Sequence, residues 1–153
     1  MQRTLICLRV IGALALFAVA ADHLYEYWVD SYSAIPTIGT LFLLNGAGAI
    51  GLGLALLAPL GALLPDQLAR RIVLLTAAGG VVLAATTLAG LFVSESEPLF
   101  GFMEYGYRLV VYVAIISEAI AIVALAPLAL FTWRAGAGAS RSPIRSPQAE
   151  QAR

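Results

Sequence analysis

Residues 72–93, IVLLTAAGGVVLAATTLAGLFV, contain no charged side chain and form one continuous apolar stretch. A helix rises about 1.5 Å per residue, so about 20 residues cross the roughly 30 Å hydrocarbon core of a membrane. Three similar stretches lie at about 5–28, 37–57 and 109–133, and short polar or Pro/Gly-containing connections separate all four. Short connections make neighbouring helices antiparallel. The sequence therefore predicts an all-α fold, a transmembrane four-helix up-down-up-down bundle over residues 1–133.

The overall composition also indicates a membrane protein. Of 153 residues, 61% are hydrophobic and 12% are charged, and the mean hydropathy is +0.90. Soluble domains are about half apolar and about a quarter charged, so this chain lacks the polar residues needed to cover a soluble globule. All nine basic residues are arginine and the net charge is zero, so no nucleic-acid partner is expected. With one His and one Cys, no metal site and no cofactor is predicted.

The arginines predict how the chain is oriented in the membrane. If four spans are drawn, eight arginines fall on one side and Arg108 alone falls on the other. The eight are Arg3, Arg9, Arg70, Arg71, Arg134, Arg141, Arg145 and Arg153. Cytoplasmic segments of membrane proteins are enriched in basic residues. We therefore expect a multi-pass membrane protein with both ends in the cytoplasm.

The first apolar stretch has a second interpretation as a signal peptide. Arg3 and Arg9 precede an apolar segment at 10–21, and Ala-Val-Ala at 18–20 resembles a cleavage site. However, the helical pattern continues without a breaker through 23–28, where Tyr and Trp resemble an interfacial aromatic belt. We expect an uncleaved helix; cleavage would leave three spans.

Residues 134–153 are rich in Gly, Ala, Ser, Pro and Arg, and are expected to form a disordered cytoplasmic tail. Two Arg-Ser-Pro sequences, at 141–143 and 145–147, offer phosphorylation or contact with anionic lipid as alternatives to a plain solubilising role.

Glu118 is the residue whose chemistry departs most from a plain apolar bundle. It lies ten positions after Arg108, so about 15 Å below the outer interface. A carboxylate at that depth costs at least a few kcal/mol and usually faces the interior of the bundle. We expect Glu118 to be protonated and to bond Asn45, about equally deep on the second span, or a threonine of the third. It would serve either as interhelical glue or as a proton carrier.

These residues define a candidate intramembrane polar cluster. Its members are Glu118, Asn45, Thr86, Thr87 and His23. The threonine hydroxyls have the alternative of bonding back to their own helix. Counted from Trp28, His23 is expected to be too shallow to meet Glu118 unless the helix tilts, and to be either a water-exposed interfacial residue or a proton carrier.

A second polar group is expected at the outer interface. Asp22 and Glu26 share one helix face, and two like charges four residues apart need water or a cation nearby. Arg108 is the arginine on that side. We predict that it forms an ion pair with Asp22 or, one turn before it, with Glu104.

Small residues on the second span predict close helix packing. Gly46, Gly48, Gly51 and Gly53 follow Asn45, and Ala47/Gly51 and Ala49/Gly53 form small-xxx-small pairs. We expect these positions to face another helix. On that expectation, Gly51→Leu would separate the packed backbones.

The segments HLYEY at 23–27, YSAIPTIGTLFLLN at 32–45 and LFGFME at 99–104, with the buried glutamate of the fourth span, resemble a family of small uncharacterised four-span integral membrane proteins of high-GC (actinobacterial) bacteria. The likeness covers about residues 10 to 130. It implies the four-span fold in a bacterial cytoplasmic (inner) membrane and carries no activity with it. Glu26 departs from the pattern, in which the aromatic stretch has no acid.

Two classes of function remain open at this point. The first is a non-enzymatic accessory or structural bundle that packs against itself or a larger membrane complex through small-residue faces. The alternative is a small proton-linked carrier or lipophilic-ligand-binding protein that uses Glu118 and Asn45. No nucleophile–base pair or metal set is found, so the sequence does not predict an enzyme.

Overall fold

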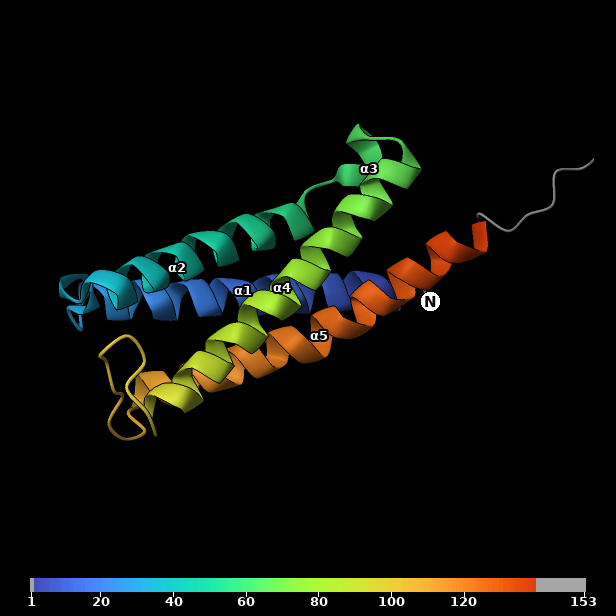
Figure 1. Ribbon diagram of the computed structural model, residues 1–153. Helices are drawn as coiled ribbons and strands as arrows, with labels where there is room; N and C mark the ends of the chain where they lie inside the picture. Colours follow the sequence, from blue (N-terminus) through green and yellow to red (C-terminus); the bar gives the residue numbers. More distant parts are fainter. Residues whose placement is uncertain (1, 140–153) are drawn as a thin grey trace, which may run out of the picture.

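The computed structural model describes residues 2–139, and this part of the chain is helical apart from its connections (Figure 1). The four long helices are α1 (Gln2–Trp28), α2 (Pro36–Leu57), α4 (Asp66–Ser94) and α5 (Leu109–Ala139). The short helices are η1 (Tyr32–Ala34) and α3 (Leu60–Leu63). The four long helices are long and apolar enough to cross a membrane. The predicted all-α bundle is confirmed.

The long helices form a ring around one core. α1 packs against both α2 and α5, α5 packs against α4, and α2 and α4 close the ring with a looser contact. Each long helix runs opposite to the one before it (Figure 1). We call the end that carries α3 and the N-terminus the α3 end, and the end that carries residues 29–35 and 95–108 the loop end. α2 and α4 lie together at the α3 end and diverge toward the loop end.

Two helices extend further than the apolar stretches predicted. α4 begins at Asp66 rather than at 72, because an acidic residue in the first turn favours a helix start and the following residues are mostly good helix formers. α5 continues to Ala139, so the expectation of disorder from 134 is wrong over 134–139. The rest of the predicted tail, including the two Arg-Ser-Pro sequences, lies outside the described residues.

The core is built from small and aliphatic side chains. Fully buried members are Ala13, Leu16, Val19, Ala49, Leu56, Ala77, Ala84, Ala121 and Leu125. Alanine at so many contact positions brings the helix backbones close together, which is how membrane helices gain packing energy. The core therefore lies nearer the α3 half of the bundle, where α2 and α4 also meet.

The small residues of α2 that pack against α1 are not the full set that the sequence predicted. Gly46 contacts Leu24, and a Cβ at Gly53 would lie 2.7 Å from the ring of Phe17. The Ala49/Gly53 pair is buried as expected. Gly51 is exposed with nothing within 4 Å of the position of a Cβ, so the prediction that Gly51→Leu breaks a helix contact is wrong. With 3.6 residues per turn, residues 46, 49 and 53 share a face that residue 51 does not.

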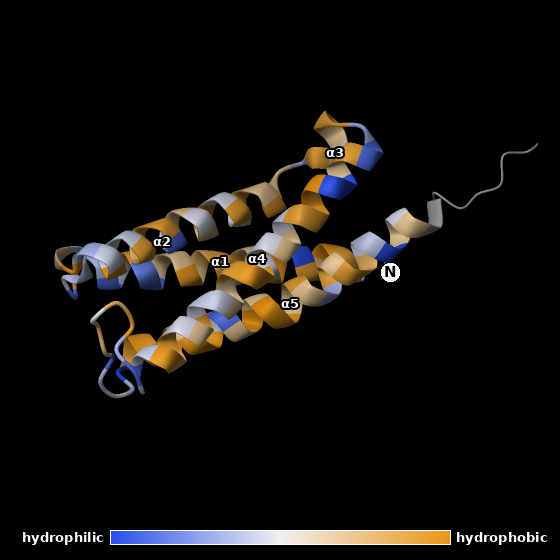
Figure 2. Cartoon of the chain, viewed as in Figure 1, coloured by the Kyte–Doolittle hydropathy of each residue, from blue (hydrophilic) through white to orange (hydrophobic). Residues whose placement is uncertain are grey.

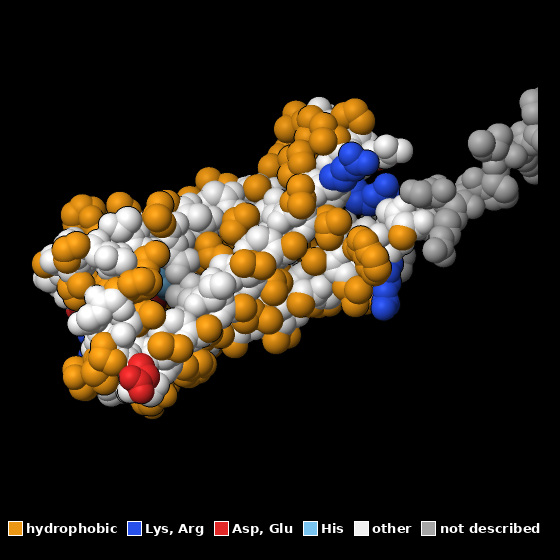
Figure 3. Space-filling model, in the orientation of Figure 1, with side chains coloured by type: hydrophobic (Ala, Val, Ile, Leu, Met, Phe, Trp, Pro, Cys, Tyr) orange, Lys and Arg blue, Asp and Glu red, His pale blue; other side chains and the backbone are white. Residues whose placement is uncertain are grey.

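The outside of the bundle suits a lipid environment. Large apolar side chains such as Leu75 and Val123 are about 70% exposed. Apolar residues follow the helices between the two ends, and more hydrophilic positions gather at the ends (Figure 2). In Figure 3, arginines gather at the α3 end and acidic atoms appear at the loop end. In water so many exposed apolar side chains would be a liability, whereas in a bilayer they face lipid.

Arg9 joins two helices at the α3 end. Its guanidinium donates through Nε to the carbonyl of Leu56 and through Nη2 to that of Ala58, at 2.6 Å. The last carbonyls of a helix have no intrahelical donor, so Arg9 caps α2 from α1. This end of the bundle is therefore closed by a polar bond as well as by packing.

Candidate functional site

A cavity of about 540 Å³ opens between α2 and α4 toward the loop end. Most of its wall is apolar and comes from α2, α4, α5 and the segment 95–108: Ile38, Leu41, Phe42, Leu44, Leu83, Gly90, Leu91, Leu99, Phe100, Phe102, Val111 and Ala114. The polar part of the wall consists of Asp22, His23, Glu26, Asn45, Thr86, Thr87, Ser94, Glu104 and Glu118. The surface is hollowed there in Figure 3. An apolar cavity of this size with a few converging polar groups is typical of small-molecule sites.

One hydrogen-bond chain crosses the cavity from α1 to α4. His23 Nδ1 lies 2.9 Å from the carbonyl of Val19 and donates to it, which leaves Nε2 as an acceptor in neutral imidazole. The amide nitrogen of Asn45 donates to His23 Nε2 at 3.2 Å and to Thr87 Oγ1 at 2.5 Å. Thr87 in turn donates to the carbonyl of Leu83 at 2.8 Å. This chain ties α1, α2 and α4 together at the level where α2 and α4 begin to separate.

Glu118 lies on the wall beside this chain but does not join it. Its side chain is 0% exposed and points into the bundle, as the sequence predicted. Its Oε1 lies 4.0 Å from His23 Nε2, and neither carboxyl oxygen has a hydrogen-bond partner within the described part of the chain. The expected bond to Asn45 or a threonine is therefore wrong. Both amide hydrogens of Asn45 are already directed to His23 and Thr87.

The structure decides between the alternatives that the sequence left open for two other cluster residues, His23 and Thr86. His23 is 2% exposed and approaches Glu118, although counting along α1 placed it too shallow. That count treated each helix as parallel to the membrane normal, whereas α1 and α5 pack side by side and bring different levels together. Thr86 borders the cavity, but it is exposed and its hydroxyl bonds back to the carbonyls of Val82 and Leu83.

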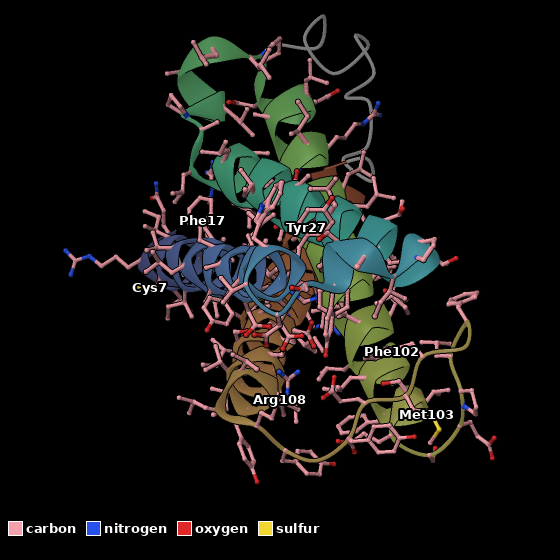
Figure 4. All side chains as sticks on the ribbon, turned by 90° about the vertical axis from the view of Figure 1, so that its left-hand side faces the viewer. Cys7, Phe17, Tyr27, Phe102, Met103 and Arg108 are labelled. Atoms are coloured by element: carbon pink, nitrogen blue, oxygen red, sulfur yellow. The ribbon has the colours of Figure 1, made fainter. Side chains whose placement is uncertain are left out.

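Arg108 organises a second polar group at the loop end, which we call the Arg108 cluster: Glu26, Asp30, Tyr32, Glu104 and Arg108. The guanidinium contacts Asp30 Oδ2 at 2.6 Å, Glu104 Oε1 at 3.2 Å and Glu26 Oε1 at 3.4 Å. Tyr32 accepts from Arg108 at 2.8 Å and donates to Glu104 Oε2 at 2.6 Å. Figure 4 looks onto this end and shows Arg108 between the ends of α1 and α5.

Asp22 does not belong to the Arg108 cluster. No ion pair between Asp22 and Arg108 forms in the described structure, and Asp22 Oδ2 instead lies 4.0 Å from His23 Nδ1. The Arg108–Glu104 pair, the local alternative, is present. Asp22 lies one turn deeper along α1 than Glu26, which takes the arginine instead.

The environment of the Arg108 cluster changes the acidity of its members. Burial and, after it, the hydrogen bond to Glu104 raise the pKa of Tyr32 well above its usual value. Burial alone would lower the pKa of Arg108, but its bond to Asp30 and the carboxylates of Glu26 and Glu104 raise it. Arg108 therefore stays charged and Tyr32 stays protonated over the physiological range.

An aromatic series joins the loop that covers the cavity to its polar wall. The ring of Phe102 lies 5.2 Å from that of Tyr32, Tyr32 lies 4.9 Å from Phe42, and Phe42 lies 5.0 Å from His23. Phe102 is held by a tight turn in which Gly101 has φ 80°, a conformation that glycine adopts easily. Leu99 and Phe102 exchange backbone hydrogen bonds across that turn.

Sequence reasoning did not find two residues of this region: Tyr32 and Phe102. Tyr32 pairs with groups 72 and 76 positions away, so no local spacing reveals the contact. The turn at 99–102 was visible only as a Gly between aromatic residues. Within the described residues, no group of three His, Cys, Asp or Glu side chains is arranged to hold a metal ion.

Comparison with known proteins adds no second view of this site. No protein-family model, no curated protein and no solved structure matches the chain. Its function has to be inferred from the membrane-protein fold and from the geometry of the cavity.

Proposed function

We propose that this membrane protein binds a small, mainly apolar molecule in the cavity between α2 and α4. The observation that carries the proposal is Glu118, which is fully buried on the cavity wall with both oxygens unpartnered among the described residues. Leaving a buried polar group without a partner costs about 1–3 kcal/mol. A bundle with a purely structural role would gain nothing from that cost, whereas a ligand would supply the missing partner.

The rest of the cavity supports the same function. Its wall is mainly aliphatic and aromatic, so it suits an apolar body. The opening lies where α2 and α4 diverge, so a molecule dissolved in the lipid can enter sideways without crossing water. The polar groups His23, Asn45 and Glu118 lie together on the wall and would orient the polar end of the ligand.

The test is to recover the ligand and then to block the cavity. The protein would be extracted in mild detergent and examined by native mass spectrometry for a bound molecule. Ala114→Phe puts a large side chain into the cavity, and Ala119→Phe, on the outward face of the same helix, is the matched control. We expect a bound molecule in the wild type and in Ala119→Phe, and none in Ala114→Phe. An empty wild type, or a ligand retained by Ala114→Phe, would overturn the proposal.

A second, also non-enzymatic, role is association with another membrane helix. It is favoured by Ala47 and Gly51, which are exposed on α2 with nothing within 4 Å of a Cβ at Gly51. Small residues on a lipid-facing helix let a second backbone approach. Disulfide crosslinking of a Gly51→Cys variant, with Cys7 replaced by Ser, tests this role. A crosslinked dimer in membranes would support self-association, and an exclusively monomeric band would count against it.

For the orientation we propose that both ends lie in the cytoplasm of a bacterium and that the loop end faces outward. The eight-to-one distribution of arginines supports this orientation. The family resemblance noted above supports a bacterial cytoplasmic membrane. A reporter active only in the cytoplasm, fused after Arg153, should be active, and N-terminal sequencing should begin near Met1. A mature protein starting near Ala21 would show that the first span is cleaved.

A further inference from the structure

The charges on the cavity wall are of one sign. Four carboxyl side chains border it, from Asp22, Glu26, Glu104 and Glu118, and no arginine borders it among the described residues. Two of the four, Glu26 and Glu104, are paired with Arg108, whereas Asp22 and Glu118 have no arginine partner among the described residues. An acidic wall of low polarity attracts cations and repels anions.

Glu118 adds a requirement for hydrogen-bond donors. An ionised carboxyl group has only acceptor sites, and neither oxygen of Glu118 has a hydrogen-bond partner among the described residues. His23 cannot donate to it, because Nδ1 donates to Val19 and Nε2 receives a hydrogen bond from Asn45. The 4.0 Å gap between Glu118 Oε1 and His23 Nε2 is too long for a hydrogen bond. A molecule in the cavity that carries N–H or O–H groups can therefore supply the donor.

From these two observations we infer that the ligand is an amphiphilic amine whose protonated nitrogen donates to the carboxylate of Glu118. This inference rests on the proposed function and names the ligand class of the same site. An ammonium group has up to three donors and a positive charge, so it can serve both oxygens of one carboxylate.

The remainder of the wall fits the remainder of such a molecule. The apolar residues of α2 and α4 would surround an alkyl or aryl body, and Phe42 and Phe102 place aromatic rings in the wall on the loop-end side. Aromatic faces attract cations, which adds to the preference for an amine over a neutral molecule. A fatty acid or a phosphate ester would bring an anion against Asp22 and Glu118, the wall carboxyls without an arginine partner in the described chain, and is disfavoured.

The inference can be tested with three probes that share one apolar body: decylamine, decanol and decanoic acid. Each would be made with a photoreactive diazirine in the chain and added to the purified protein in lipid nanodiscs. Labelling would be quantified by mass spectrometry. We expect decylamine to label cavity residues with at least tenfold higher apparent affinity than decanol, and decanoic acid to label them least.

Two carboxyl variants then identify the group responsible. Glu118→Gln removes the charge and should reduce decylamine labelling at least tenfold, to the level of decanol. Glu97→Gln, an exposed carboxyl outside the cavity, should leave the labelling unchanged. Labelling of decylamine that persists in Glu118→Gln would overturn the assignment of this residue.

The Ala114→Phe variant separates failure of this inference from failure of the proposed function. If decylamine and decanol label the wild type equally and both are blocked by Ala114→Phe, the cavity binds lipophilic molecules and the amine preference is wrong. If neither probe labels the cavity residues, both proposals are overturned. The comparison of the three probes uses the wild-type protein, so it stands even if a variant fails to fold.

Discussion

The Arg108 cluster and Glu118 are two buried acidic sites in the same half of the bundle, but the partners of their carboxyl groups differ. Glu26 and Glu104 are 4% and 7% exposed, and both contact Arg108. Glu118 is 0% exposed and contacts no donor within the described chain. Burial is nearly equal, so the difference lies in the partner. The carboxyl groups of the first site are paired within the protein, as expected of a structural contact, whereas that of Glu118 has no partner in the described chain, as the proposed ligand site requires.

Removing Arg108 should have the largest effect, because it leaves two buried carboxylates without their cation. We expect Arg108→Ala to lower the free energy of unfolding by about 3 kcal/mol, the low end for breaking a buried ion pair, since the Arg108 side chain is 41% exposed. Thermal unfolding in detergent measures the change. Arg3→Ala, at an exposed arginine, should change stability by less than about 0.5 kcal/mol. Equal melting curves for Arg108→Ala and Arg3→Ala would show that the Arg108 cluster does not stabilise the fold.

A substitution at Gly39 tests whether close backbone packing next to Tyr32 stabilises the Arg108 cluster. A Cβ at Gly39 would lie 2.5 Å from the carbonyl oxygen of Tyr32 and 3.0 Å from Cα of Ser33, and backbone atoms cannot move aside cheaply. We expect Gly39→Ala to cost about 2 kcal/mol by overpacking. Gly51→Ala, in open space, should instead stabilise α2 by up to about 1 kcal/mol through helix propensity. A stable Gly39→Ala protein would show that η1 and α2 can separate without cost.

The raised pKa of Tyr32 predicts loss of stability at alkaline pH. Above about pH 10 the unfolded chain releases the phenol proton while the folded chain retains it, so stability falls by up to about 1.4 kcal/mol per pH unit. Below that pH the contribution is fully present. Melting temperatures of the wild type and Tyr32→Phe, measured from pH 8 to 11, should show a shallower decline in the variant. Tyr105→Phe, at a tyrosine that is 77% exposed, should decline like the wild type; parallel curves for all three proteins would exclude the role of Tyr32.

Glu118→Gln should have the smallest effect on folding. Since the carboxyl has no partner in the described structure, its replacement by an amide of similar shape should change the free energy of unfolding by less than about 1 kcal/mol. Glu104→Gln, which weakens bonds to Arg108 and Tyr32, should cost about 1.5–3 kcal/mol in the same assay. If the two variants are equally destabilised, Glu118 has a structural partner. If Glu118→Gln cannot be folded, the comparison between the two sites fails.

Some features were readable in the sequence because they depend on short-range periodicity. The four spans follow from unbroken apolar stretches, and α2 begins at Pro36, a favoured first residue of a helix. The burial of Glu118 follows from its small neighbours Ser117 and Ala121, which lie on the same face of α5 and are also buried. The Arg108–Glu104 pair spans one turn of chain and was likewise visible.

The partners of the polar residues depended on how separate helices are placed. Asn45 was assigned to Glu118 by depth, yet its amide bonds His23 and Thr87 on the two helices that flank α2. Gly51 was assigned to a seam that the true rotation of α2 turns away from α1. The depth of a residue along its helix does not fix its hydrogen-bond partner, because the bond also depends on the rotation and the inclination of both helices.

By itself, then, the sequence determined that the chain is a membrane protein of four apolar helices, with a carboxyl buried in the last of them. Those properties follow from transfer free energies and helix geometry, which act residue by residue. Only the tertiary structure decided that α2 and α4 diverge, that Tyr32 joins Arg108, and that Glu118 faces a cavity without a partner from residues 2–139. These features depend on contacts between positions far apart in the chain. Rigid helices of fixed length must share one core, and a space remains wherever two of them cannot pack closely.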